Sequence, residues 1–336
     1  MSLAKSIQNA WNKQSAWLVL LRPLSCVYGC AFALNKALYQ AGIKKVYNAP
    51  VPVMIIGNIT VGGSGKTPLL IQLVQYLRQK NIRVGVISRG YGGKGPFPLF
   101  VDADATADLV GDEPCLIVQR TAVPMAVGPN RQQAIELLLQ HGQFDLILSD
   151  DGLQHWALAR QIEWVVLDRT RGLGNEKLLP EGYLREPKTR LQQVTVIEHT
   201  SETNATYAMQ LQLGQPYLIH STQSSQSVFD AKQHYHVVVG IGYPERFYRS
   251  LTEIGVRNCT QHEFVDHHAY SLDDLKFEDN SPIITTEKDA VKIKALLNAD
   301  SAQLPNEIWV LPVDAVLSDA CYTLLNQQLR QLNICA

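Results

Sequence analysis

Short apolar segments alternate with longer amphipathic ones through the first part of the chain. The short segments are rich in Val, Ile and Leu, which is typical of strands buried on both faces. They occupy residues 51–56, 83–88, 123–127, 144–148 and 164–167. Residues 69–77 and 131–141 lie between them and repeat apolar positions at helical spacing. Strands alternating with helices predict an α/β fold with a parallel sheet covered on both faces.

The pattern changes near residue 205. Residues 207–213 and 217–220 flank Gly214-Gln215-Pro216 and predict a short β-hairpin. Strand-like segments at 236–242, 282–286 and 308–311 then predict a second, smaller α/β lobe. We therefore expect a larger parallel-sheet domain that a β-hairpin hinge joins to a smaller C-terminal lobe. The expected parts are residues 1–48 (N-terminal helices), 49–205 (the first domain), 206–230 (the hinge) and 231–336 (the C-terminal lobe).

The N-terminal part is apolar between residues 15 and 34, but Arg22-Pro23 divides this stretch. Neither half approaches the roughly 20 residues that a membrane-spanning helix needs. Trp17, Tyr28 and Phe32, with lysines on both sides, favour helices that lie in a membrane interface. A helical hairpin packed on the core is the alternative.

The charge distribution is strongly asymmetric. No Asp or Glu precedes Asp102, while twelve Lys and Arg residues do, so all 31 acids and the other 18 basic residues follow. A cationic front end indicates a polyanionic partner, and its apolar character favours a membrane surface over nucleic acid. The six cysteines are scattered without a Cys-x-x-Cys pair, which favours reduced thiols in the cytoplasm over disulfides or a zinc site.

A glycine-rich loop separates the strand at 51–56 from the helix at 69–77. Its glycines allow backbone N–H groups to turn toward an anion, Lys66 can reach the β and γ phosphates, and the Thr67 hydroxyl can hold Mg²⁺. The loop comprises Thr60, Val61, Gly62, Gly63, Ser64, Gly65, Lys66 and Thr67. Thr60 stands where the usual motif has glycine. The context predicts a P-loop NTPase-like domain that binds a nucleoside triphosphate, with a ligand-free turn as the alternative.

Carboxylates and cations follow other predicted strands. Asp150 and Asp151 end the strand at 144–148, where an NTPase holds Mg²⁺, although such a pair can also cap a turn. Arg89 and Arg131 can bind phosphate oxygens, and Asp112 with Glu113 offers a candidate base.

In the second lobe, Asp266-His267-His268 can share a proton with a carboxylate across a cleft, or form an ordinary turn. Two adjacent histidines make poor joint metal ligands. The segment at 285–290 reads as a strand end that leads into a helix capped by Thr286.

Taken together, these motifs resemble the tetraacyldisaccharide 4′-kinases of Gram-negative bacteria. The matching segments are GNITVGGSGKTP (57–68), SRGYGG (88–93), GDEP (111–114), SDDGLQH (149–155), LPEGYLREP (179–187), GIGYPERF (240–247), DHHAY (266–270) and TEKDAVK (286–292). Thr60 is similar to that family's own loop. The resemblance implies an ATP- and Mg²⁺-dependent kinase that phosphorylates the 4′-hydroxyl of tetraacyldisaccharide 1-phosphate to give lipid IVA. It also implies a peripheral enzyme at the cytoplasmic face of the inner membrane.

The resemblance further implies roles for individual residues. Asp112 would be the base, paired with His267 or His268, of which we favour His267. Lys66 would act on the donor phosphates, and the Mg²⁺ ligands would be Thr67, Asp150, Asp151 and Glu186. The substrate-binding set would be Arg89, Tyr91, Glu113, Arg131, Gln154 and His155.

Two other functions fit parts of the sequence. A membrane-associated ATPase switch would carry a second lysine before the glycine pair, where this chain has Val61. A nucleotide-binding scaffold would need neither Asp112 nor the Asp-His-His segment.

Overall fold

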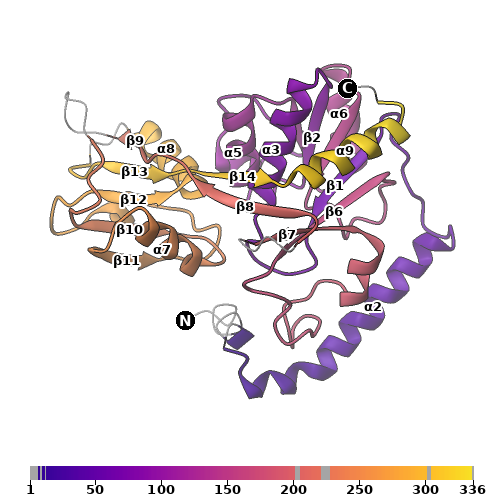
Figure 1. Cartoon of the computed structure of the whole chain (residues 1–336), viewed down its shortest axis with the longest axis horizontal. Coiled ribbons are helices and arrows are strands. Elements are labelled where there is room, and N and C mark those ends of the chain that lie inside the picture. Colours follow the sequence, from indigo (N-terminus) through magenta and orange to yellow (C-terminus); the bar gives the residue numbers. More distant parts are fainter. Residues whose placement is uncertain are drawn as a thin grey trace.

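Two β-sheets form two lobes (Figure 1). A cleft lies between them. The computed structural model describes residues 7, 10–11, 13–200, 205–220, 228–300 and 304–334. The helices are α2 (Arg22–Gln40), α3 (Lys66–Gln79), α4 (Ala107–Val110), α5 (Asp112–Thr121), α6 (Arg131–Gln140), α7 (Pro244–Glu253), α8 (Glu287–Asp300) and α9 (Asp319–Gln331). Short 3-10 helices are η1 (Ala16–Leu21), η2 (Lys188–Gln193) and η3 (Leu272–Leu275).

The first lobe contains a nine-stranded sheet in the order β14-β8-β7-β6-β1-β5-β2-β4-β3. Its strands are β1 (Val53–Gly57), β2 (Val84–Ser88), β3 (Leu99–Phe100), β4 (Met125–Val127), β5 (Leu146–Asp150), β6 (Ile162–Asp168), β7 (Thr195–His199), β8 (Ala208–Leu213) and β14 (Val313–Leu317). All neighbouring pairs are parallel except β3 with β4 and β14 with β8. The predicted α/β class with a mainly parallel sheet is confirmed.

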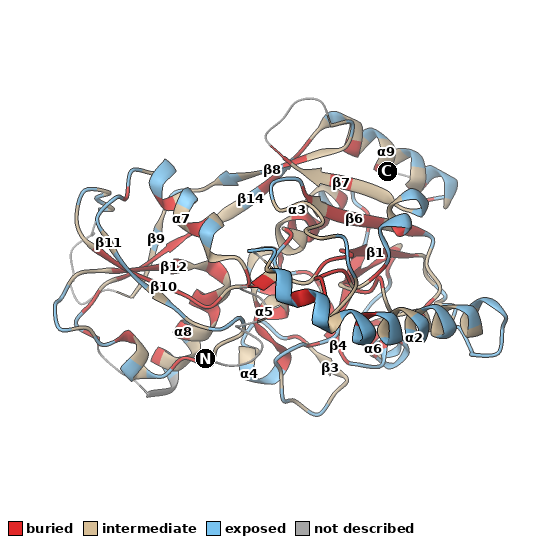
Figure 2. Cartoon of the chain, turned by 90° about the horizontal axis from the view of Figure 1, so that it is seen from below, coloured by how far each residue is buried: buried red, intermediate tan, exposed pale blue. Residues whose placement is uncertain are grey.

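Alternating side chains of β1 explain why this strand is fully buried. Met54 and Ile56 join the core on the side of α3, whereas Val53 and Ile55 join the core on the side of α6. A strand with helices on both faces has no polar side to expose, and Figure 2 shows the central strands β1 and β6 mainly as buried. The carboxyl ends of these strands are thereby held as a rigid platform.

The second lobe contains a five-stranded sheet in the order β11-β10-β12-β13-β9. Its strands are β9 (Tyr217–His220), β10 (Tyr235–Val239), β11 (Cys259–Glu263), β12 (Ile283–Thr286) and β13 (Ile308–Leu311). Strands β10 to β13 pair in parallel, and β9 is the antiparallel edge. The predicted cap of α8 is confirmed, since the Thr286 hydroxyl accepts a hydrogen bond from the backbone N–H of Asp289 at 3.2 Å.

The expected hairpin between residues 207–213 and 217–220 is wrong in its pairing. β8 pairs with β14 in the first sheet, and β9 pairs with β13 in the second. The two lobes are therefore joined by two chain crossings, at Gly214-Gln215-Pro216 and at Pro312, where the Gly214 N–H donates to the Pro312 carbonyl at 3.0 Å. Figure 1 shows these crossings side by side as a two-stranded antiparallel ribbon. A change in the angle between the lobes would have to bend both crossings.

The expected C-terminal boundary at residue 336 of the second lobe is also wrong. After Pro312 the chain returns to the first lobe, where β14 becomes an edge strand and α9 packs on α3. The rings of Tyr76 and Tyr322 lie 4.6 Å apart, and the Trp164 indole N–H donates to Gln328 at 3.0 Å. The second lobe is therefore an insertion between β8 and β14, because the last helix completes the core of the first lobe.

Arg22-Pro23 does not divide the N-terminal helix, contrary to expectation. η1 runs directly into α2, because Pro23 occupies the first turn of α2, where its missing N–H leaves no hydrogen bond unmade. Among the described residues, 16–40 form the one helical segment that is long and apolar enough to cross a membrane, judged by length and composition alone.

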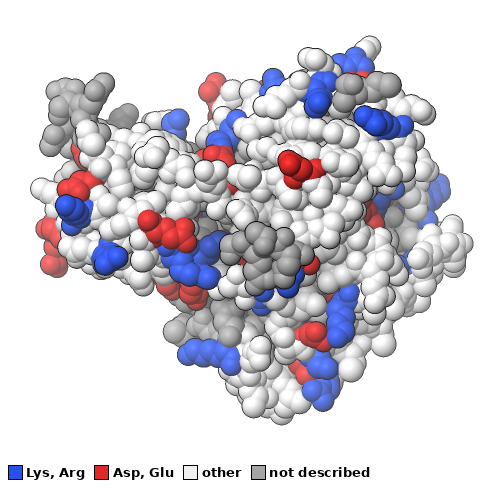
Figure 3. Space-filling view, viewed as in Figure 1, with Lys and Arg blue, Asp and Glu red and all other residues white. Residues whose placement is uncertain are grey.

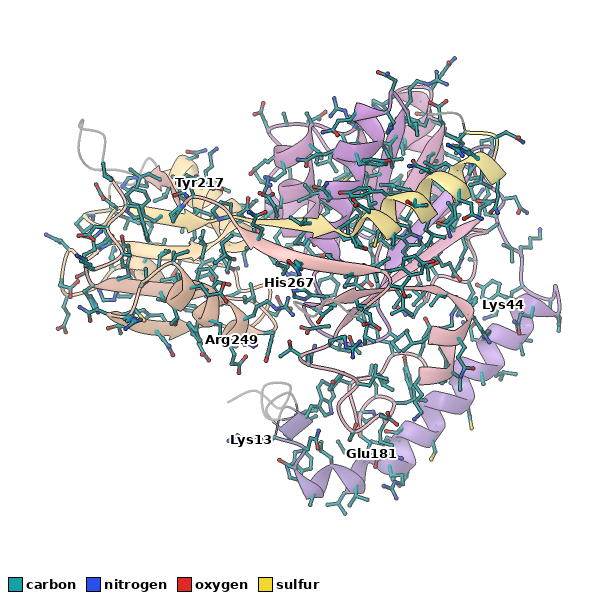
Figure 4. All side chains as sticks on the ribbon, in the orientation of Figure 1. Lys13, Lys44, Glu181, Tyr217, Arg249 and His267 are labelled. Atoms are coloured by element: carbon teal, nitrogen blue, oxygen red, sulfur yellow. The ribbon has the colours of Figure 1, made fainter. Side chains whose placement is uncertain are left out.

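One face of α2 is docked on the first lobe along its length. Arg22 forms a 2.8 Å salt bridge with Glu181 near the start of the helix, and the rings of Phe32 and Trp156 lie 6.3 Å apart farther along. Figure 1 shows α2 running along the outside of the lobe, with Glu181 beside it in Figure 4. The predicted interface helices are therefore a single helix with one docked side.

Candidate active site

A cleft of about 1410 Å³ lies between the lobes, at the carboxyl ends of the central strands of the first sheet. The first lobe contributes the glycine-rich loop and the ends of β2 and β5, and the second lobe contributes residues 241–243, Arg246, His267 and Lys288. In Figure 4, His267 lies at the junction of the two lobes. A ligand in this cleft would contact both lobes at once.

The glycine-rich loop has the backbone form that anion binding requires. Gly62 and Gly65 have φ angles of +100° and +97°, a region that favours glycine, and Lys66 begins α3 directly after Gly65. The first turn of α3 contains no acidic residue. Its positive dipole and the Lys66 ammonium therefore act together on the same end of the cleft. Thr60, by contrast, is buried beside Leu184 and does not line the cleft.

Two carboxylates at the end of β5 face the loop, as predicted. Asp151 lies 2.8 Å from Arg185 and 3.8 Å from Lys66. Burial raises the pKa of Asp150; it opposes ionisation of Asp151 as well, but Lys66 and Arg185 outweigh it and lower the pKa of Asp151. Asp151 is therefore ionised more readily than Asp150.

This site fits a divalent cation. The Oδ1 atom of Asp150 is buried and has no hydrogen-bond partner among the described residues, and Ser88 is 3.4 Å from Oδ2. A buried carboxylate oxygen without a donor is costly unless a cation supplies the missing interaction. Thr67 lies in the first turn of α3 and lines the same cleft. Hard oxygen ligands of this kind suit Mg²⁺.

Asp112, which is buried, and His267, which lines the cleft, meet between the two lobes. Asp112 begins α5 in the first lobe, and the Nδ1 atom of His267 in the second lobe is 3.1 Å from its Oδ1 and 3.0 Å from its Oδ2. Burial opposes ionisation of Asp112, but the hydrogen bond from His267 and two nearby lysines outweigh it and hold the pKa of Asp112 below its usual value. Asp112 is therefore a carboxylate at neutral pH.

His268 is turned away from this pair. Its Nε2 atom lies 3.3 Å from Asp274, and its ring stacks on Phe264 with centroids 4.5 Å apart. The two adjacent side chains thus point in different directions, and His267 has a φ of +61°. Of the two candidates, His267 is the one brought to Asp112.

Lys288 connects the acids and the histidine, and sequence reasoning missed it. Its ammonium lies 3.3 Å from Glu113, 3.1 Å from Asp266 and 3.4 Å from the Nε2 atom of His267. Burial opposes the charge, but the surrounding carboxylates outweigh it and raise the pKa of Lys288. Lys288 thus stays charged and donates hydrogen bonds to both lobes.

Lys292 lies one turn farther along α8. Its ammonium is 3.8 Å from Asp112 and 3.0 Å from Asp289. Both lysines belong to the TEKDAVK segment, which we read as a capped helix. Only their position on the face of α8 that packs against α5 distinguishes them from ordinary surface lysines.

The predicted substrate residues Arg89, Tyr91, Glu113, Arg131, Gln154 and His155 all line the cleft. Burial lowers the pKa of Arg131 to about 10, so this side chain is still a cation at neutral pH. Burial and nearby arginines lower the pKa of His155 to about 4, so it is neutral there. Tyr91 contacts the His267 ring edge-on at 4.8 Å.

Glu186 lies behind this surface. It is fully buried, accepts a 2.7 Å hydrogen bond from Gln154 and lies 3.3 Å from Arg190. It is not among the residues that line the cleft, unlike the other predicted Mg²⁺ ligands.

Three further arginines lie at the site, two on the loop and one on Asp151, and sequence reasoning did not assign them. Arg171 donates to the Val61 carbonyl at 2.6 Å, and Arg246 from the second lobe donates to the Gly63 carbonyl at 3.2 Å and pairs with Asp168. Arg185, which pairs with Asp151, and Arg246 both lie inside segments that carried the family resemblance. The position of Arg185 and Arg246 in these segments was the one sequence signal that could have identified them as site residues.

The chain is similar to known proteins over nearly its whole length. The family model for tetraacyldisaccharide-1-P 4′-kinase (LpxK) matches residues 17–330. A protein of Psychrobacter arcticus named tetraacyldisaccharide 4′-kinase is 46% identical and covers 99% of this chain and 97% of its own. The protein of that name from Pseudomonas syringae pv. tomato is 43% identical and covers 99% of this chain and 100% of its own.

A solved structure shares the fold. It is a crystal structure of LpxK from Aquifex aeolicus in complex with ATP, with a TM-score of 0.75 and 24% sequence identity, and the match covers 94% of this chain and 99% of that one. At this identity the likeness establishes the two-lobed architecture. The sequence matches extend over nearly the whole length, and on their strength the chain belongs to the tetraacyldisaccharide-1-P 4′-kinase family.

Proposed function

We propose that this protein transfers the γ-phosphoryl group of ATP to the 4′-hydroxyl of tetraacyldisaccharide 1-phosphate and so forms lipid IVA. The observation that carries the proposal is that the glycine-rich loop and His267, which contacts the buried carboxylate of Asp112, line the same cleft. The loop belongs to the first lobe, and the pair Asp112–His267 spans both lobes. A simple nucleotide-binding scaffold has no need for the second feature.

In the reaction, the sugar 4′-oxygen forms a bond to the γ-phosphorus while the bond from that phosphorus to the β–γ bridging oxygen breaks. ADP leaves, and the hydroxyl proton passes to Asp112. The lowered pKa keeps Asp112 ionised and ready to accept a hydrogen bond from the hydroxyl group. Proton transfer can come late, because the transition state of phosphoryl transfer is loose and needs positioning more than a strong base.

His267 and Lys288 together set the orientation of that carboxylate. Lys288 is a hydrogen-bond donor only, so its contact with His267 assigns Nε2 as the acceptor. The proton of a neutral imidazole then sits on Nδ1 and is donated to Asp112. We assign Lys288 as the positioning residue that fixes this tautomer. Lys288 belongs to the second lobe and also contacts Glu113 of the first lobe. The orientation of His267 therefore depends on the two lobes being together.

Thr67, Asp150 and Asp151 are the residues that would hold Mg²⁺, and Lys66 would contact the β and γ phosphates. Mg²⁺ supplies positive charge to the phosphate oxygens when it is bound. Arg131 and Arg89 would bind phosphate oxygens farther along the cleft, beside the neutral His155. Glu186 would support Gln154 from behind rather than bind the ion.

The outer face of α2 is suited to contact with a lipid surface. It carries exposed apolar side chains at positions three or seven residues apart, which lie on one helical face. They are Leu24, Val27 and Leu34, with exposed fractions of 58%, 66% and 62%, and Leu20 of the preceding η1 is 76% exposed. In Figure 3, the region of the molecule where α2 lies shows uncharged areas between a few basic and acidic groups.

We propose that α2 lies in the membrane interface at the cytoplasmic face of the inner membrane. The contacts of Arg22 with Glu181 and of Phe32 with Trp156 hold two ends of the helix on the protein. A helix that is docked in this way presents one side to lipid instead of crossing the bilayer. Tyr28, on the docked side, donates to the backbone of Arg185 beside the cleft, so the membrane and the active site are adjacent.

ATP labelled in its γ-phosphate tests the proposal. Incubation with Mg²⁺ and the disaccharide 1-phosphate in detergent micelles should move the label into the lipid, and the Lys66→Ala variant should not do this. Label that appears only as inorganic phosphate would favour a membrane-associated ATPase switch. Label that stays in ATP would favour a scaffold.

A further inference from the structure

A group of histidines in the second lobe lies away from the cleft. One ligand atom from each of His234, His236 and Asp279 falls within 4.8 Å of the other two. His234 precedes β10 and His236 is inside it, so the two rings, two residues apart along an extended chain, emerge on the same face. Asp279 approaches from the segment that precedes β12.

In both His234 and His236, one ring nitrogen makes a hydrogen bond to a residue outside this group of three. The Nδ1 atom of His236 is 3.0 Å from the Nε2 atom of His262, and its Nε2 atom is 2.9 Å from Asp279. The Nε2 atom of His234 is 2.9 Å from the Thr260 hydroxyl. Imidazoles that bind metals are oriented by such a hydrogen bond on the nitrogen that does not bind. The nitrogens that face the centre of the group are therefore Nε2 of His236 and Nδ1 of His234.

The central ring cannot move far. His236 is 7% exposed and stacks on Phe277 with ring centroids 3.9 Å apart, and Phe277 also lies against His262 at 4.3 Å. A ring held in this way is oriented before a metal ion binds.

We propose that His234, His236 and Asp279 bind a divalent transition-metal ion, with Zn²⁺ as the best fit. Two imidazoles and one carboxylate are borderline ligands of the kind that Zn²⁺ takes, and water would complete a tetrahedral set. The site lies at the amino end of β10, whereas the carboxyl end of that strand leads to the cleft at residues 241–243. The ion would therefore tie the start of β10 to the segment around Asp279, as a structural site.

Calorimetric titration of the full-length protein with Zn²⁺, after chelator treatment and in the presence of Mg²⁺, tests this site. We expect one equivalent to bind and to raise Tm. His234→Ala and Asp279→Ala should each abolish that equivalent and the rise in Tm. Both changed side chains are partly or largely exposed, so the variants should fold. His220→Gln, in the same lobe but outside the group, should retain both effects.

Co²⁺ gives a second readout. Binding at a four-coordinate site should produce an intense visible absorption band in the wild type and in His220→Gln, and should not in Asp279→Ala. The proposal is overturned if the wild type binds no equivalent of Zn²⁺, or if His234→Ala and Asp279→Ala bind it as the wild type does. Neither outcome depends on kinase activity.

Discussion

The Nδ1 atom of His267 lies 3.0 Å from Oδ2 of Asp112, although 155 positions separate the two residues and each belongs to a different lobe. The arrangement of base and orienting group therefore exists only while the lobes are together. Closure also excludes water that would otherwise accept the phosphoryl group. The two chain crossings at Gly214-Gln215-Pro216 and Pro312 join the lobes, so their conformation determines whether Asp112 and His267 are in contact.

Replacement of Asp112 by Asn should lower kcat by about 10²- to 10⁴-fold, the range typical of general acid–base catalysis. The amide keeps the shape of the side chain but cannot take the hydroxyl proton. Binding of ATP, measured by nucleotide titration, should be nearly unchanged. Asp108→Asn is the matched control because Asp108 is exposed and lies in the neighbouring helix α4. A comparable loss of ATP binding in Asp112→Asn would contradict the role of this residue as the base.

Replacement of His267 by Ala should change the pH dependence as well as the rate. The hydrogen bond from His267 is the largest effect that lowers the pKa of Asp112, while burial acts in the opposite direction. Without the histidine the pKa of Asp112 rises, so the acid limb of the kcat/KM profile should move to higher pH. His268→Ala should leave the limb in place, because His268 contacts Asp274 instead. An unmoved limb in His267→Ala would remove His267 from the mechanism.

Replacement of Lys288 by Met should lower kcat by about 10- to 100-fold, as expected for the loss of a hydrogen bond to a charged group worth about 1.5–3 kcal/mol. Lys288→Arg should recover part of this loss, since a guanidinium can also donate to His267. The KM for ATP should change little. Lys294→Met, on the same helix but exposed, is the control. Equal kcat values for Lys288→Met and Lys294→Met would refute the positioning role.

Two acidic residues on the outer face of α2, introduced as Leu24→Asp with Val27→Asp, should weaken partition onto anionic vesicles at least about tenfold. Val228→Asp in the second lobe is the control, because Val228 is 84% exposed but distant from α2 in sequence. Sedimentation with vesicles measures the effect. Equal sedimentation of the variant and the wild type would show that α2 is not the membrane contact.

The sequence predicted local features of the fold well and its long-range pairings poorly. The parallel strands of the first lobe carry the apolar runs of doubly buried strands, so β1, β2 and β5 were recognisable. Nothing in β8 or β9 indicates a partner about a hundred positions later, because two short apolar segments around a Gly-Gln-Pro turn satisfy the hairpin pattern equally well. The return of α9 to the first lobe is hidden for the same reason.

The site divides along similar lines. Lys66 was predicted from the glycine-rich loop, and Asp150 and Asp151 were predicted from the end of a neighbouring strand. Both signals are local in the sequence. The family resemblance favoured His267 over His268, and in the structure His267 is the one that contacts Asp112. Lys288 and Lys292 look like solvated charges on an amphipathic helix, and only the packing of α8 on α5 makes them neighbours of Asp112.

The mass and structure of the product test the central claim most directly. Purified protein incubated with Mg²⁺-ATP and tetraacyldisaccharide 1-phosphate should convert the lipid to a species heavier by one phosphoryl group, with the new phosphate on the 4′-oxygen. Lys66→Ala should leave the lipid unchanged. Consumption of ATP with no gain in lipid mass, or a phosphate placed at another hydroxyl, would contradict the proposed function.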